Sequence, residues 1–167
     1  MAFIDIEEPL LESKVSRAEL NEILNGYSHP IDVRQVANKL GIIIVEDVHM
    51  DKELSGKLEK MGGKWYIYVN AFHNEKRKRF TIAHEIAHYI LHADETAVFK
   101  DVSFFRSPDT NEQESQANAL AAEILMPEHA FIQEIERGNN TILGLAETFG
   151  VSGIACEYRA KTLNLIR

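Results

Sequence analysis

The chain is organised around one stretch, Phe80-Thr81-Ile82-Ala83-His84-Glu85-Ile86-Ala87-His88-Tyr89-Ile90-Leu91-His92. It contains the pattern His-Glu-x-x-His and has neither Gly nor Pro, so its apolar residues favour a helix. On that helix His84 and His88 lie on one face, where both imidazoles can reach a single metal ion. Glu85 follows His84 directly, so its carboxylate can face a water molecule on that metal without being a ligand. The alternative is a chance match, in which the two histidines are ordinary helix residues. A further ligand in the right place would make chance a poor explanation.

A catalytic zinc site takes three protein ligands and keeps one position open. A second helix is predicted over residues 110–127, with Thr110 or Asn111 as its cap and Pro127 near its end. This helix offers three carboxylates that compete for the role of third ligand, and they are Glu112, Glu114 and Glu123.

Helix geometry separates the three glutamates. Glu114 shares a face with Asn118 and Ala121, where small residues allow another helix to approach closely. Glu112 and Glu123 each point roughly 160–180° away from Glu114, taking 100° per residue. Glu114 is therefore the predicted third ligand. Asn118, one turn later, is a candidate to hold a ligating imidazole by its second nitrogen.

These two helices resemble the ImmA/IrrE family of metallopeptidases. The matching segments are residues 79–92 and 114–127, with weaker similarity over 31–42 and 145–159. The resemblance covers about residues 30–165 and is to the short form of the family, without the sensor domain that some members add. Ala87 stands where the family usually has Gly, and Leu120 where it usually has Phe.

The resemblance implies a zinc-dependent endopeptidase that cleaves a specific protein partner, a helix-turn-helix transcriptional repressor of a phage or mobile element. By this similarity His84, His88 and Glu114 are the Zn2+ ligands and Glu85 is the general base. The implied fold class is α+β, a mostly helical zincin-like domain of minimal gluzincin type. Its small mixed β-sheet is expected to pack on the metal-binding helix.

Two segments have the β-branched and aromatic residues of strands. Residues 42–45 predict a short buried strand, and 65–69 predict the clearest strand, preceded by a glycine turn at 61–64. Residues 54–59 predict a weaker strand. By fold analogy an edge strand of this sheet pairs with extended substrate, although a purely structural role is equally consistent with the sequence.

Length and composition predict one soluble globular domain over residues 1–167. Within it, the resemblance implies a catalytic core at 28–130, followed by C-terminal helices at 131–167. The net charge of −8 argues against a general nucleic-acid binder. The start of the chain lacks the features of a signal peptide, and no stretch approaches the roughly 20 apolar residues that span a bilayer. The single Cys156 fits a reducing compartment, so a cytoplasmic protein is expected.

The C-terminal residues 145–155 have a helix-turn-helix pattern with Gly150 at the turn. An alternative function is therefore a non-proteolytic regulatory module that binds DNA or a repressor and holds a structural zinc. Its second helix offers only Arg159 and Lys161 as cations, which favours a packing pair or a docking surface over DNA recognition. The basic residues at 75–79 either attract an acidic partner or form a solvated first helical turn.

Several side chains keep two interpretations. His92 is a candidate to stabilise the oxyanion but is expected at a solvent-exposed helix end, and His129 is expected near the cleft by analogy. Residues 93–109 are predicted to form a loop whose aromatic residues either line a substrate rim or anchor the loop. The other oxyanion candidates are Tyr66, Tyr68 and Tyr89. The aromatic residues of the loop are Phe99, Phe104 and Phe105.

Overall fold

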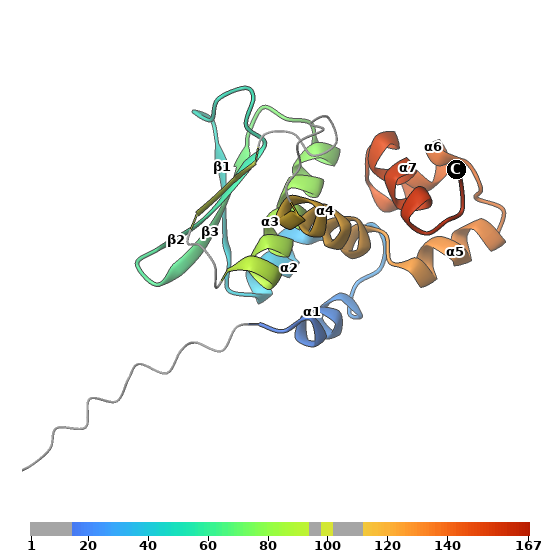
Figure 1. Cartoon of the computed structure of the whole chain (residues 1–167), viewed down its shortest axis with the longest axis horizontal. Helices are drawn as coiled ribbons and strands as arrows, with labels where there is room; N and C mark the ends of the chain where they lie inside the picture. Colours follow the sequence, from blue (N-terminus) through green and yellow to red (C-terminus); the bar gives the residue numbers. More distant parts are fainter. Residues whose placement is uncertain (1–14, 94–97, 102–111) are drawn as a thin grey trace, which may run out of the picture.

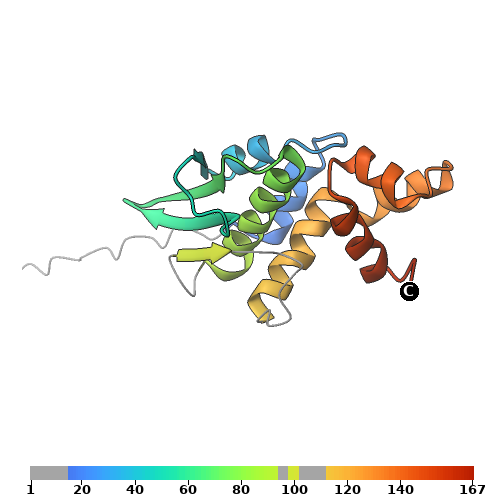
Figure 2. The ribbon, with the colours of Figure 1, turned by 90° about the horizontal axis from the view of Figure 1, so that it is seen from above.

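Helix α3, Glu75–His92, lies at the centre of the computed structural model, which describes residues 15–93, 98–101 and 112–167. The Asn74 side chain caps the helix and accepts a hydrogen bond from the backbone N–H of Arg77. From Phe80 onward most of its residues are buried, because α3 lies between the sheet and helix α4 (Figures 1 and 2). The predicted helix is confirmed.

The sheet has the strand order β1-β3-β2-β4, with β1 at Ile43–Asp47, β2 at Gly56–Met61, β3 at Lys64–Asn70 and β4 at Val98–Asp101. Strand β1 runs parallel to β3, whereas β2 pairs antiparallel with both β3 and β4. The register places Leu58 opposite Ile67, and both are fully buried. The sheet is therefore mixed, and α3 contacts β2 and β3 (Figure 1). This arrangement confirms the α+β prediction.

Strand β4 was not expected, because the sequence predicts a loop over residues 93–109. Its four residues pair antiparallel with β2, so that Phe99 lies opposite Leu58. A strand this short has too few residues for a clear alternation, and its pairing partner lies some forty positions earlier in the chain. Four residues with sequence predictions lie outside the described part of the chain. They are Phe104, Phe105 and the two alternative cap residues Thr110 and Asn111.

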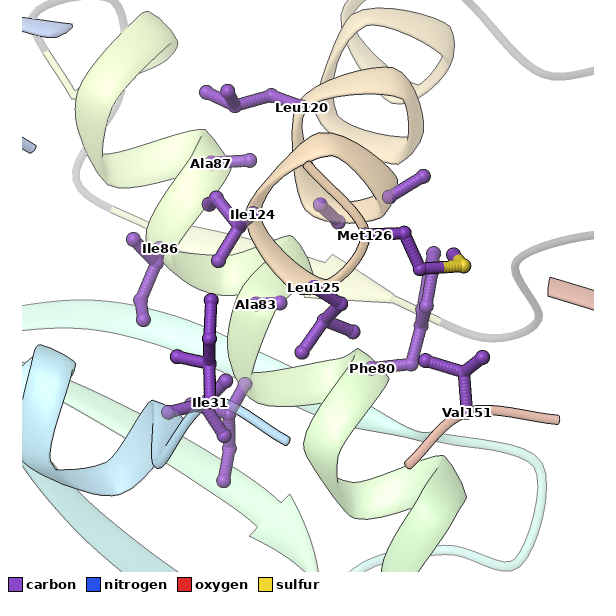
Figure 3. Packing of buried hydrophobic residues seen from close by; sticks show 14 of the residues in the cluster. Ile31, Phe80, Ala83, Ile86, Ala87, Leu120, Ile124, Leu125, Met126 and Val151 are labelled. Atoms are coloured by element: carbon purple, nitrogen blue, oxygen red, sulfur yellow. The ribbon is translucent and has the colours of Figure 1, made fainter. Parts of the chain in front are cut away.

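Helix α4, Glu112–Leu125, packs along α3 through a face of small residues. Figure 3 shows Ala83 and Ala87 of α3 beside Ile124 and Leu125 of α4 in the shared core. Alanine side chains let the two helix backbones approach closely, which brings the first turn of α4 toward the last turns of α3. The close packing of these two helices positions the candidate site.

Two short helices precede the sheet, and three follow α4. They are α1 at Arg17–Leu24, α2 at Val33–Lys39, α5 at Glu128–Glu136, α6 at Ile142–Phe149 and α7 at Gly153–Thr162. Helices α6 and α7 meet at Gly150, whose φ of 64° favours glycine. The helix-turn-helix pattern therefore does form a pair of helices.

Two arginines fasten the C-terminal helices to the rest of the fold. Arg79 of α3 donates from Nε to the carbonyl of Gly150, 3.0 Å away, and also to the carbonyls of Phe149 and Ile31. Arg159 of α7 is only 8% exposed and donates from Nε to the carbonyl of Met126 over 2.9 Å. These bonds satisfy backbone carbonyls at element ends, where no regular partner exists.

Candidate metal centre

His84 and His88 point to the same side of α3, one turn apart, as their spacing predicts. Both imidazoles are fully buried, and their ring centroids lie 4.7 Å apart at an interplanar angle of 84°. A pair of buried polar rings needs partners that replace water. The principal partner comes from α4.

Glu114, in the first turn of α4, faces both imidazoles. Its Oε2 lies 3.1 Å from Nε2 of His84, and its Oε1 lies 2.9 Å from Nε2 of His88. The Glu114 side chain is 26% exposed, so solvent reaches this otherwise buried cluster at its carboxylate. The structure thus brings together the three residues that the sequence singled out as metal ligands.

The geometry of the three donors fits a small divalent metal. One ligand atom from each residue lies within 4.8 Å of the others. Around a tetrahedral zinc with ligand bonds of about 2.0–2.1 Å, neighbouring donor atoms lie about 3.4 Å apart. Two imidazoles and one carboxylate are also a donor set that zinc accepts in catalytic sites. The site therefore fits the ion that the sequence predicts.

The other two glutamates of α4 have different partners. Glu123 forms an ion pair with Arg17 of α1. Glu112 accepts a hydrogen bond from the side-chain amide of Gln116, with 3.4 Å between the heavy atoms. Among the three glutamates only Glu114 belongs to the described cluster of potential metal ligands.

Glu85 is fully buried on α3, directly after His84. Gly56, the first residue of β2, lies so close that a Cβ built there would be 3.1 Å from Oε1 of Glu85. The same Cβ would be 2.4 Å from Cγ2 of Thr81, a distance that real Cβ atoms do not adopt. The absence of a side chain at Gly56 therefore leaves the space that the Glu85 carboxylate occupies.

The segment before β2 is fixed by side chains around Gly56. Nδ2 of Asn70 donates to the carbonyl of Leu54 over 3.0 Å, and Nη2 of Arg77 donates to Oγ of Ser55 over 3.0 Å. Ser55 is fully buried. These contacts hold the backbone at residue 56 against α3 and limit how far it can move away from Glu85.

His92 corrects the sequence interpretation, which placed it at a solvent-exposed helix end. It is 2% exposed, with its Nδ1 2.9 Å from Nδ1 of His88 and its Nε2 2.9 Å from Oε1 of Gln116. The spacing of four residues from His88 was the available signal for this contact. Gln116 belongs to another helix, so no local pattern predicts it.

Two of the other candidate residues, Tyr66 and Tyr68, lie on the face of the sheet away from α3. Strand alternation places Trp65 on the α3 side of the sheet, in ring contact with Tyr89, and it puts Tyr66 and Tyr68 on the opposite face. Tyr66 and Tyr68 stack on each other there, with their ring centroids 6.2 Å apart. His129 is exposed on α5.

The basic residues at 75–79 form specific contacts at the start of α3. Lys76 pairs with Glu147 over 3.0 Å, Lys78 pairs with Glu46 over 3.2 Å, and Arg77 and Arg79 make the hydrogen bonds described above. These contacts favour the first helical turn over a patch that binds an acidic partner. The side chains are not simply solvated, because they pair with residues of other elements.

The cations of α7 are also engaged within the protein. Arg159 is buried against Met126, and Nζ of Lys161 lies 3.0 Å from a carboxylate oxygen of Glu157 on the same helix. A DNA-reading helix presents its cations outward to phosphates and bases.

Cys156 lies on the same helix, and its burial raises the pKa of the thiol to about 11, which keeps it protonated and unreactive at neutral pH. No helix in the described ranges combines the length and apolarity needed to cross a membrane.

Comparison with known proteins adds two findings. The sequence profile of a peptidase family described as the IrrE N-terminal-like domain matches residues 37–161. The chain is also 39% identical over 83 residues to the radiation response metalloprotease IrrE of Deinococcus radiodurans. That alignment covers 48% of this chain and 25% of the relative, so the matched region corresponds to a quarter of the relative's length.

Proposed function

Because the chain belongs to the peptidase family of the IrrE N-terminal-like domain, we propose that it is a zinc-dependent endopeptidase. The observation that carries this proposal is the convergence of His84, His88 and Glu114 beside a buried Glu85. A structural zinc site usually has four protein ligands, whereas three ligands leave a position for water or substrate. The donor set is therefore of the catalytic kind.

In this proposal His84, His88 and Glu114 hold the zinc ion, and the chemistry that zinc supplies when bound is Lewis acidity toward the scissile carbonyl and water. Glu85 acts as general base and accepts the proton of the attacking water on a carboxylate oxygen. The same carboxyl group then returns the proton to the amine nitrogen of the leaving fragment. The close approach of the Gly56 backbone limits the positions from which Glu85 moves this proton.

We further propose that the substrate is one specific protein, a helix-turn-helix repressor of a phage or mobile element, and that the enzyme acts in the cytoplasm. The resemblance to ImmA/IrrE metallopeptidases supports the repressor, and the single unreactive Cys156 is consistent with a reducing compartment. The contacts of Arg79 and Arg159 support treating the catalytic core, residues 28–130, and the C-terminal helices, residues 131–167, as one domain.

The alternative of a DNA-binding module with a structural zinc has less support. Both cations of α7 are bonded within the chain, and the net charge is −8. Electrostatic attraction to phosphates supplies most of non-specific DNA affinity, and an acidic protein lacks it. This alternative predicts salt-sensitive DNA binding without any cleavage product.

The proposed function is tested by mapping new protein N-termini in a lysate of the host cell. The zinc-loaded protein should generate new N-termini in one or very few proteins, a helix-turn-helix repressor among them. The Glu85→Gln protein and a sample treated with chelator should generate none. New N-termini that appear equally with both proteins would refute the proposed activity, whereas a single cleaved protein of another class would refute only the repressor.

Gly56→Ala should impair catalysis without removing the metal ligands. The new Cβ would overlap Thr81 and crowd Glu85, so the base is displaced, and a misplacement of about 1 Å costs roughly 100-fold in rate. We expect kcat/KM for the cleaved substrate to fall by about that factor, and the free energy of unfolding to fall by about 1–3 kcal/mol.

Gly153→Ala is the matched control, because a Cβ there finds its nearest neighbour, Cγ2 of Ile142, at 4.0 Å. It should leave the cleavage rate unchanged. A Gly56→Ala protein with wild-type kcat/KM would show that this close approach does not position Glu85.

A further inference from the structure

The imidazole of His92 joins a residue of the metal centre to α4. On one side its Nδ1 lies 2.9 Å from Nδ1 of His88, and on the other its Nε2 lies 2.9 Å from Oε1 of Gln116. His92 is almost fully buried, and its ring centroid is 5.1 Å from that of His88. Two nitrogen atoms at 2.9 Å form a hydrogen bond only if one of them carries the proton.

The chain of contacts favours one placement of that proton. The amide nitrogen of Gln116 faces the carboxylate of Glu112, which can only accept, so the amide oxygen of Gln116 faces His92. An amide oxygen accepts, and therefore Nε2 of a neutral His92 must hold its hydrogen. Nδ1 of His92 is then an acceptor, and Nδ1 of His88 must be the donor.

This assignment leaves Nε2 of His88 without a hydrogen. It is this nitrogen that faces Glu114, 2.9 Å from Oε1. A histidine binds a metal ion through an unprotonated ring nitrogen, and a hydrogen bond at the other nitrogen selects the tautomer and fixes the ring plane. The relay thus presents His88 in the form that a metal requires.

We propose that His92 and Gln116 are positioning residues, which hold His88 in its metal-binding tautomer and orientation and so raise the zinc affinity of the site. They act through His88, and neither belongs to the cluster of potential metal ligands. Gln116 lies two residues after Glu114 in the first turns of α4. The same relay therefore also fixes the position of α4, and with it Glu114, relative to α3. This inference rests on the proposed metal site.

The test is the zinc dissociation constant of the full chain, measured by competition with a chromophoric chelator. His92→Leu fills similar space but can neither accept from His88 nor donate to Gln116, and we expect zinc affinity to fall about 10–100-fold. His92→Gln can both accept and donate, so it should restore most of the affinity. Gln116→Met, at an exposed position, removes only the outer acceptor and should cause a smaller loss of several-fold.

Two controls separate positioning from folding. His129→Gln, at an exposed histidine outside the cluster, should leave the affinity unchanged. The absorption spectrum of the cobalt-substituted protein reports the ligand field, and it should change in His92→Leu and recover in His92→Gln. Thermal unfolding of each apoprotein identifies a variant that has lost its fold. If His92→Leu does not fold, the zinc affinity of Gln116→Met tests the relay instead.

The possible outcomes are distinct. Folded His92→Leu and Gln116→Met proteins whose zinc affinities lie within twofold of wild type would overturn the relay. Equal losses in His92→Leu and His92→Gln would also overturn it, because they would indicate bulk packing alone. A wild-type protein that binds no zinc would instead refute the metal site on which the proposed function rests.

Discussion

Glu85→Gln is expected to lower kcat/KM for the cleaved substrate by about 1000-fold, within the 10²–10⁴-fold range of general acid–base catalysis. The amide has nearly the shape of the carboxylate, but it cannot accept the proton of the attacking water. A 1000-fold loss corresponds to about 4 kcal/mol of transition-state stabilisation. Because Glu85 is not among the three converging donors, zinc affinity should stay within a few-fold of wild type.

The measurement for Glu85→Gln is single-turnover cleavage of the identified substrate, with metal content determined on the same samples. Glu123→Gln makes the same chemical change on α4 at a carboxylate that is paired with Arg17, and it should retain the wild-type rate. Since Glu85 is fully buried, thermal unfolding must show that the variant is folded. A folded, zinc-loaded Glu85→Gln protein with wild-type activity would contradict the assigned base.

Glu114→Ala is expected to weaken zinc binding by more than about 100-fold. Loss of groups that only orient a ligand already costs about 10–100-fold, and Glu114 faces both histidines directly. Two imidazoles alone leave two or more positions to water, so the remaining ion should exchange rapidly. Cleavage should fall in parallel with zinc occupancy and recover only in part at high zinc concentration.

Glu123→Ala and Glu112→Ala are the matched controls for Glu114→Ala, because all three carboxylates lie on α4. Each of the two controls should keep the wild-type dissociation constant. Glu123→Ala should lose at most about 1 kcal/mol of unfolding free energy, since its ion pair with Arg17 is solvent-exposed. A loss of zinc in Glu123→Ala with full binding in Glu114→Ala would show that the wrong glutamate was assigned.

The features that could be predicted from sequence are those that depend on helix periodicity. A spacing of four places His84 and His88 on one face, and the same 100° step distinguishes Glu114 from Glu112 and Glu123. The small residues on the Glu114 face of the second helix indicated close approach to another helix, and α4 does pack against Ala83 and Ala87 of α3 (Figure 3). Periodicity was sufficient here because each prediction concerned residues within one rigid helix.

The features that sequence did not predict depend on contacts between distant elements. His92 seemed to lie at an exposed helix end because its partner Gln116 belongs to α4. The sequence favoured a packing role for the helix of Arg159 but did not show its partner, the carbonyl of Met126, just after the end of α4. Similarly, β4 depends on pairing with β2. In each case the deciding partner lies far along the chain, where local propensity carries no information.

The most direct test of the central claim, that His84, His88 and Glu114 hold one zinc ion, is anomalous diffraction at the zinc edge from crystals of the zinc-loaded protein. We predict one strong peak per chain, within bonding distance of Nε2 of both histidines and of the Glu114 carboxylate. A structure at full zinc loading with no peak between these three residues, or with its only peak elsewhere, would contradict the account.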